Sequence, residues 1–254
     1  MDIISAPSPN FNDRREALDM LVLHYTGMAD GPSALERMRD PEASVSAHYM
    51  VEEDGRIFQL VAEDKRAWHA GVSRWQGDED LNSRSIGIEI VNGGHNVPLP
   101  DGTLPPFPEV QIDAVIALCQ AILSRYDIPQ SRIVGHSDIA PDRKEDPGEH
   151  FPWKRLSEHG IGFWPEYPEE RELTKLSERD LPLKLGAKDK RVTSLQEDLQ
   201  AIGYPIELSG ACDEQMEKVI TAFQRRWNQS DVSCVVDPLT FALIRRVAAF
   251  ASES

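Results

Sequence analysis

Positive charge is scarce in this chain of 254 residues. Lys and Arg number 27 against 43 Asp and Glu, which gives a formal net charge of −16 at pH 7. A chain this acidic is repelled by phosphate backbones and anionic headgroups, so we expect no nucleic acid among its partners. Apolar runs are also short. None approaches the roughly 20 residues that cross a bilayer, so the sequence predicts no membrane span.

Cysteine is nearly absent. The three residues, Cys119, Cys212 and Cys234, are odd in number and form no close pair. This favours free thiols in a reducing compartment, with a Cys212–Cys234 bridge as the alternative. The N-terminus shows neither the basic nor the apolar region of an export signal, so we expect a cytoplasmic protein, or a periplasmic one if a signal has been removed. Nothing in the sequence specifies an oligomeric state.

The first two thirds of the chain alternate between strand and helix patterns. Strands are predicted at 20–26, 49–52, 57–61, 85–91 and 132–136, and a helix at 108–126 follows a proline-rich loop. In 85–91 the two-residue period puts three isoleucines on one face and Glu89 on the other. The predicted apolar stripe of the helix is Val110, Ala114, Leu118, Ala121 and Ile122.

The composition changes after Trp164. Residues 166–180 are acidic and contain little apolar periodicity, which predicts a linker. From 181 to 254 three amphipathic stripes predict a small helical bundle. The predicted organisation is therefore a catalytic domain at 1–165, the linker, and an all-α three-helix domain at 181–254. The fold class is α/β (α+β), with a mixed β-sheet flanked by helices in the first domain.

Two histidines and an aspartate suggest a metal site. His24 and His136 each end an apolar strand, and Asp146 follows in a turn rich in proline and glycine. A lone histidine at a strand end is usually structural, so the prediction depends on the combination. Neutral imidazole and carboxylate are both good zinc ligands. Three protein ligands leave a fourth position open for water, which is typical of catalytic rather than structural zinc.

Several blocks carry a family resemblance. Residues 23–26, 67–73, 85–89, 135–141 and 144–148 read LHYT, AWHAGVS, SIGIE, GHSDIAP and KEDPG. In order and spacing they resemble the zinc-dependent N-acetylmuramoyl-L-alanine amidases of the AmpD-like type, whose fold is related to the peptidoglycan-recognition proteins. The resemblance covers about residues 15–165 and implies a mixed sheet with a zinc cleft on one face.

The resemblance also implies roles for individual residues. His24, His136 and Asp146 match the zinc ligands, Glu89 the general base, and Lys144 the cation beside the metal. The implied reaction is hydrolysis of the amide between the lactyl group of N-acetylmuramic acid and L-alanine. The substrate is peptidoglycan or a muropeptide, in bacterial cell-wall turnover or recycling. The sequence leaves open whether it is the intact wall or a soluble anhydro-muropeptide.

Four further residues are candidate substrate contacts. Trp68 and His69 resemble the family's cleft wall, although Trp68 as a core residue and His69 as a satisfied partner are equally good interpretations. Asn82 and Arg84 could meet carboxylates of the peptide, or could be solvated loop residues. Other histidines look structural or exposed, with His48 as a structural residue.

The C-terminal part resembles the peptidoglycan-binding three-helix module. The resemblance depends on residues 192–199, 203–204, 222–227 and 236–240. It departs from the module at Cys234-Val235, where a glycine is expected before the Val-Asp pair. The alternative is a bundle that only docks on the first domain. For the whole chain, the alternatives to a zinc amidase are a non-catalytic muropeptide-binding protein of the same fold and a structural zinc protein.

Overall fold

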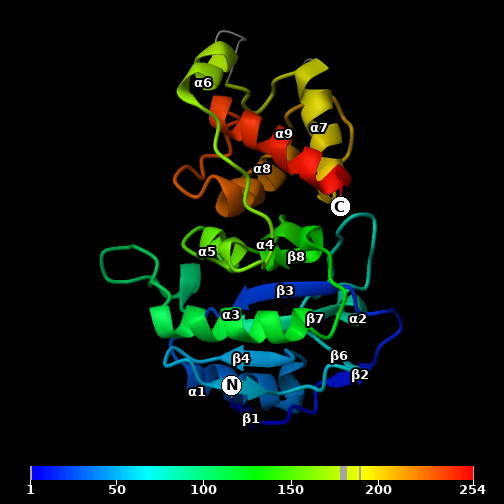
Figure 1. Cartoon of the computed structure of the whole chain (residues 1–254), viewed down its shortest axis with the longest axis vertical. Coiled ribbons are helices and arrows are strands. Elements are labelled where there is room, and N and C mark those ends of the chain that lie inside the picture. The colour runs from blue at the N-terminus through cyan, green and yellow to red at the C-terminus, as the bar shows by residue number, and fades with distance from the viewer. Residues whose placement is uncertain (1, 178–181, 189, 254) are drawn as a thin grey trace.

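The computed structural model describes residues 2–177, 182–188 and 190–253. A mixed sheet with helices forms the N-terminal part, and the helices of the C-terminal part pack at one end of it (Figure 1). The sheet has the strand order β1-β5-β4-β7-β3-β8, and every neighbouring pair is parallel except β4 and β5. Its strands are β1 (Ile3–Ser5), β3 (Met20–Tyr25), β4 (Tyr49–Val51), β5 (Ile57–Gln59), β7 (Ser85–Ile90) and β8 (Ile133–Gly135). The predicted fold class is confirmed.

A second, smaller sheet and several helices complete the N-terminal part. A two-stranded ribbon pairs β2 (Phe11–Asp13) with β6 (Lys65–Ala67). The helices are α1 (Gly31–Arg39), α2 (Leu81–Arg84), α3 (Glu109–Leu123), α4 (His136–Ile139) and α5 (Trp153–Glu158), with 3-10 turns η1 (Pro41–Ala43), η2 (Gly94–Asn96) and η3 (Gln130–Arg132).

Strand β3, which lies between β7 and the edge strand β8, is buried on both faces, as its continuous apolar run predicts. Leu21 and Leu23 belong to the same apolar cluster as the inner face of α3. Met20 and Val22 point the other way and belong to a cluster that includes the C-terminal helices. His24 continues this second face, so the alternation of side chains along β3 directs it away from α3.

The inner face of α3 matches the predicted stripe only in part: Leu118 and Ile122 are buried as predicted. Val110 is 51% exposed, whereas Ile112 and Val115 are buried. Gln111 is also buried, and its Nε2 donates to the carbonyls of Val51 and Val91 at 3.2 and 2.8 Å. Because most positions of this helix are apolar, periodicity alone could not select the face that meets the sheet.

The three predicted C-terminal helices are α7 (Lys190–Ile202), α8 (Glu214–Trp227) and α9 (Pro238–Glu253). The segment predicted as a linker contains helix α6 (Glu170–Ser177). The step from linker to domain at 180–181 lies outside the described residues, and the domain limits remain a prediction. No helix in the described part of the chain is long and apolar enough to cross a membrane. All three cysteines are free thiols.

The C-terminal helices do not stand apart from the sheet. A single apolar cluster joins Trp75, Val134 and Ile139 to the buried faces of α7, α8 and α9. The Trp75 ring meets that of Tyr204 edge-on at 5.1 Å. The two parts therefore share a core, which the sequence pattern of two separate amphipathic units does not reveal.

Candidate metal centre and active site

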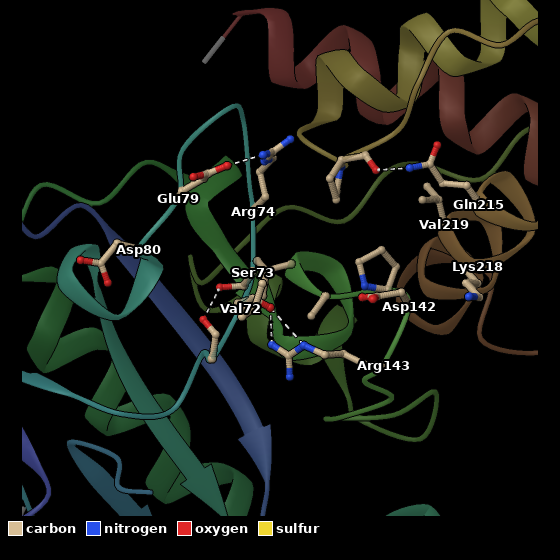
Figure 2. A pocket seen from close by; sticks show the side chains of 15 residues that line it. Val72, Ser73, Arg74, Glu79, Asp80, Asp142, Arg143, Gln215, Lys218 and Val219 are labelled. Atoms are coloured by element: carbon tan, nitrogen blue, oxygen red, sulfur yellow. Dashed lines mark hydrogen bonds and ion pairs between the residues drawn. The ribbon is translucent and has the colours of Figure 1, made fainter. Parts of the chain in front are cut away.

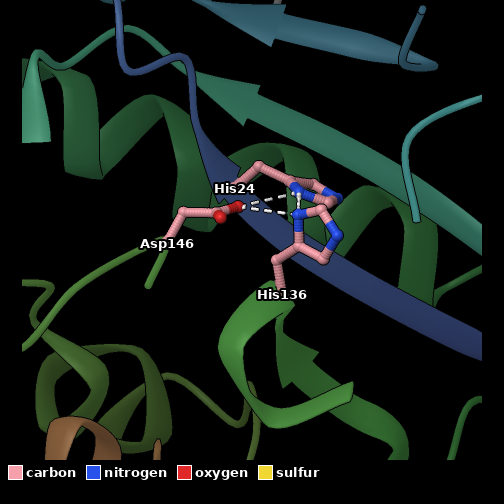
Figure 3. A group of neighbouring side chains, drawn as sticks. All are labelled: His24, His136 and Asp146. Carbon is pink, nitrogen blue, oxygen red and sulfur yellow. Dashed lines mark hydrogen bonds and ion pairs between the residues drawn. The ribbon is translucent and has the colours of Figure 1, made fainter. Parts of the chain in front are cut away.

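Three side chains converge where the strands end. Nδ1 of His24 lies 2.9 Å from Nδ1 of His136, and Oδ2 of Asp146 lies 3.0 Å from each of these nitrogens (Figure 3). All three side chains are buried. The sequence-predicted ligand set is therefore brought together, although its residues lie up to 122 positions apart in the chain.

The backbone explains this convergence. In the parallel pair β3–β8, Leu23 is the register partner of Gly135, so the residue following each lies at the same end of the sheet. These following residues are His24 and His136, and His136 is also the first residue of α4. The backbone N–H of Ser137 donates to the carbonyl of Asp146 at 2.9 Å, which fixes the third side chain beside them.

Hydrogen bonds set the tautomer of each histidine. Nε2 of His136 donates to the carbonyl of Ala70 at 3.1 Å, so its Nδ1 presents a lone pair. For His24 the tautomer is set by a chain of hydrogen bonds through Ser85 and His69, which we call the relay. The hydroxyl of Ser85 donates to the carbonyl of Leu81 at 2.6 Å, and therefore accepts from Nε2 of His69 at 3.2 Å.

The relay continues to the metal site. Since Nε2 of His69 carries the proton, its Nδ1 accepts from Nε2 of His24 at 3.0 Å. Nδ1 of His24 is then left with a lone pair facing the other two groups. Strand β7 makes room for this arrangement at Gly87, because a Cβ there would lie 2.4 Å from the His69 ring. This is the usual support for a metal-bound histidine, whose second nitrogen donates to a protein acceptor.

Three convergent lone pairs fit a cation. Burial, and then the charge of the His136 ring, lower the pKa of His24 to about 4. Burial acts to raise the pKa of Asp146, but the two histidines hold it well below its usual range. A tetrahedral zinc site with bonds of about 2.0–2.1 Å separates ligand atoms by about 3.3 Å, close to the separations here. The residues present therefore fit Zn²⁺ with an open position.

Glu89 lies beside this group. It faces away from the isoleucines of β7, as predicted, and is the register partner of His24 on β3. Its Oε2 is buried and has no hydrogen-bond partner among the described residues. Burial raises the pKa of Glu89 well above its usual value, and the charge of Asp146 adds to this shift. An unpaired, buried carboxylate beside a metal site is suited to accept and release a proton.

Lys144 is half-buried near the same site. Its positive charge opposes the upward shift in the pKa of Glu89 and adds to the downward shift in that of His24. Its ammonium group forms no ion pair with any residue in the described ranges. It is therefore available to stabilise negative charge that develops near Glu89 and the ligands.

The predicted substrate contacts have other partners. His69 is buried behind His24 in the relay, so the interpretation as a satisfied partner fits its geometry. Oδ1 of Asn82 accepts from the backbone N–H groups of His69 and Ala70 at 2.9 and 2.8 Å, and so fixes the loop that orients the ligands. Nε1 of Trp68 donates to Asn12 at 2.9 Å.

Arg84 is engaged by acids on neighbouring segments. It pairs with Glu16, Asp19 and Asp78 at 3.3–3.5 Å. The geometry therefore gives no support to Arg84, Asn82 or His69 as substrate contacts, and Trp68 remains a prediction. Long-range partners of this kind cannot be derived from loop composition alone.

Two histidines that look exposed in the sequence are half-buried beside Gly148, in the turn that follows Asp146. Nδ1 of His95 lies 3.0 Å from the hydroxyl of Tyr25, the residue after His24. His95 also pairs with Glu149 at 3.2 Å, and the Phe107 ring stacks on His150 at 4.7 Å. No local pattern marks these residues, because their neighbours come from distant loops.

A groove of about 680 Å³ lies between the N-terminal part and the C-terminal helices (Figure 2). One wall is the loop around Val72 and the other is the start of α8, with Lys218. Arg143 lies between them and donates to the carbonyl of Ala70 at 2.6 Å. The same carbonyl accepts a hydrogen bond from Nε2 of His136. Ala70 therefore bonds both a residue of the groove and a predicted ligand, although His24, His136 and Asp146 are not among the residues that line the groove.

Comparisons with known proteins agree with this geometry. The family model described as N-acetylmuramoyl-L-alanine amidase matches residues 14–149, more than half of the chain. The chain belongs to this family. A second model, described as "Putative peptidoglycan binding domain", matches residues 188–244. Membership confirms the sequence-based assignment of the chain to the amidases.

Individual relatives are similar over 61–65% of the chain. The amidase AmiD of Escherichia coli is 41% identical over 177 residues, which cover 65% of this chain and 63% of AmiD. The 1,6-anhydro-N-acetylmuramyl-L-alanine amidase AmpD of Enterobacter cloacae is 35% identical over 176 residues, which cover 61% of this chain and 89% of AmpD.

Solved structures extend the likeness to the C-terminal helices. AmiD in complex with anhydro-N-acetylmuramic acid-L-Ala-D-gamma-Glu-L-Lys superimposes with a TM-score of 0.77 at 32% identity, over 96% of this chain and 99% of AmiD. AmpDh3 of Pseudomonas aeruginosa gives a TM-score of 0.78 at 34% identity, over 92% of each chain.

Proposed function

We propose that this chain hydrolyses the amide between the lactyl group of N-acetylmuramic acid and L-alanine in 1,6-anhydro-muropeptides, with Zn²⁺ held by His24, His136 and Asp146. The observation that carries the proposal is the convergence of three buried lone pairs beside the unpaired Oε2 of Glu89. A non-catalytic binding protein of the same fold has no need for this combination. A structural zinc site would be closed by a fourth protein ligand.

Zinc in this site supplies a Lewis acid that lowers the pKa of water and polarises a carbonyl. The proton transfers are carried out by a residue of the chain itself. Glu89 takes a proton from water and passes it to the leaving amine of L-alanine. Its buried setting favours the protonated form, so it can hold the proton between the two steps. Lys144 stabilises the negative charge on the former carbonyl oxygen.

The anhydro-muropeptide substrate is supported by the relatives. AmpD is named for the 1,6-anhydro sugar, and the AmiD and AmpDh3 structures were solved with anhydromuramic peptides bound. The C-terminal helices carry the family match to a peptidoglycan binding domain, so intact wall is the second candidate substrate. In the cytoplasm the enzyme would meet soluble muropeptides, and in the periplasm it would meet the wall.

Three measurements test this proposal. Purified protein should contain about one zinc per chain, and a chelator should abolish release of the peptide from anhydro-muropeptide, with recovery on adding zinc. Activity on anhydro-muropeptide should exceed that on intact sacculi when both are followed by mass spectrometry of the products. Cell fractionation would show which substrate the protein meets. Undiminished cleavage by zinc-free protein would refute the metal-based proposal.

A further inference from the structure

Two adjacent arginines of α8 reach from the C-terminal part into the segments that carry the metal site. Arg226 donates from Nη1 to Oδ2 of Asp138 at 2.6 Å and from Nη2 to the carbonyl of Ile133 at 2.7 Å. Arg225 donates to Oε1 of Glu145 at 2.6 Å. The first of these spans β8 and α4, and the second holds the loop before Asp146.

Asp138 is the centre of the first contact. Its Oδ2 also accepts from the backbone N–H of Gly135 at 2.8 Å, and its Oδ1 accepts from the hydroxyl of Tyr204 at 2.7 Å. Asp138, Arg226 and Tyr204 are 1%, 4% and 2% exposed. A buried carboxylate with three donors is firmly held, and removing its charged partner leaves an uncompensated charge in the interior.

The guanidinium of Arg226 is fixed from both sides. Its carbon lies 4.4 Å from the centre of the Trp153 ring and 4.5 Å from that of Trp227. Trp153 begins α5 in the N-terminal part and Trp227 ends α8. A planar guanidinium placed between two rings with two donors engaged has little freedom, and lysine cannot reproduce this geometry.

The segments held in this way contain two of the three predicted ligands. His136 is the first residue of α4, two positions before Asp138. Ser137 of the same helix donates its backbone N–H to the carbonyl of Asp146. A shift of α4 would therefore move both His136 and Asp146 relative to His24, which is fixed separately by strand β3 of the sheet.

We propose that the C-terminal part positions the metal ligands: Arg226, with Tyr204, holds Asp138 and thereby α4, so that metal affinity depends on this contact between the two parts. Arg226 and Tyr204 are positioning residues, since they reach the ligands only through Asp138. This inference rests on the proposed function, because it requires a metal at His24, His136 and Asp146. It gives the C-terminal helices a role in addition to any binding of peptidoglycan.

The test uses the full chain and measures zinc affinity directly. Zinc dissociation constants are determined by competition with a chromophoric chelator for the wild type and for Arg226→Met, Arg226→Lys and Tyr204→Phe. We expect Arg226→Met to weaken zinc binding about 10- to 100-fold, the range typical of supporting partners of metal ligands. Arg226→Lys should recover part of the loss, and Tyr204→Phe should weaken binding less than Arg226→Met.

The matched control is Arg245→Met. Arg245 lies on α9 of the same part and bonds Asp198 and Ser194 there, with no hydrogen bond or ion pair to α4 among the described residues. This variant should bind zinc like the wild type. Circular dichroism of the zinc-free proteins shows which variants fold. If Arg226→Met does not fold, the positioning role is tested by Tyr204→Phe, which loses only a single hydroxyl.

The outcomes separate the two proposals. If the wild type binds zinc and folded variants at Arg226 and Tyr204 bind it equally well, the positioning role is refuted and the proposed function is untouched. If the wild type itself binds no zinc, both fail. Equal loss of affinity in Arg245→Met would also refute the positioning role, because it would show a general effect of destabilising the C-terminal helices.

Discussion

Glu89 and His24 are register partners on the neighbouring parallel strands β7 and β3. Their side chains therefore stand on the same face of the sheet, one carrying the proposed base and the other a proposed ligand. The backbone ladder fixes their separation, so no loop has to close to bring them together. This rigid placement lets the role of Glu89 be tested without loss of the metal site.

Glu89→Gln should retain zinc but lose turnover of anhydro-muropeptide. The amide fills the same space but cannot accept the proton from water, and general base catalysis typically contributes about 10²–10⁴-fold. The assay is kcat on zinc-loaded protein, with metal content measured in parallel. Glu16→Gln, which alters an exposed partner of Arg84, is the control. Wild-type kcat in Glu89→Gln would eliminate Glu89 as the base.

Lys144→Met should lower kcat about 10²–10³-fold with a smaller change in KM. The reason is that a positive charge near the site stabilises the oxyanion more than the neutral carbonyl of the substrate. Lys218→Met is a matched control, since Lys218 lines the adjacent groove on α8. A change confined to KM in Lys144→Met would instead assign Lys144 to substrate binding.

Ser85→Ala should weaken zinc binding about 10-fold while leaving the kcat of the zinc-saturated enzyme close to that of the wild type. Without the hydroxyl, Nε2 of His69 loses its acceptor, and the tautomer that orients His24 is no longer fixed. Ser83→Ala, whose hydroxyl bonds Asp80 instead, should bind zinc normally. Equal zinc affinity in the two variants would contradict the relay.

The sequence predicted the parts of the site that depend on local pattern. The apolar runs predicted His24 and His136 at strand ends. The two-residue period of β7 predicted that Glu89 faces away from the isoleucines. The partners that fix those side chains were not accessible in the same way. Ser85 and His69 meet only after β7 and the loop that follows β6 have packed, so no spacing along the chain encodes their contact.

The same physical limit explains the other differences. In α3 the apolar residues surround most of the helix, so the buried face was set by the sheet and not by periodicity. The contact of Arg226 with Asp138 joins positions 88 residues apart, and an arginine on a helix predicts an exposed charge until its partner is seen. Tertiary hydrogen bonds between buried polar groups thus account for most of what the sequence missed.

His48 makes a testable contribution to the pH dependence of stability. Its Nδ1 accepts from the backbone N–H of Gly87 at 3.0 Å, and Nε2 lies 3.0 Å from the carbonyl of Lys65. Burial, and then the charge of Arg14, lower the pKa of His48 to about 3. An unfolded chain has a histidine pKa of about 6.5, so between these values only the unfolded state binds the proton.

Stability should therefore fall as the pH drops from about 6.5 toward 3, and His48→Gln should reduce this dependence. One proton taken up on unfolding corresponds to about 1.4 kcal/mol per pH unit. Urea unfolding of zinc-free wild type and His48→Gln at pH 7, 6 and 5 measures the difference in slope. Glutamine keeps one acceptor and one donor, so the variant should fold at pH 7. Parallel pH profiles for the two proteins would show that folding does not lower the pKa of His48.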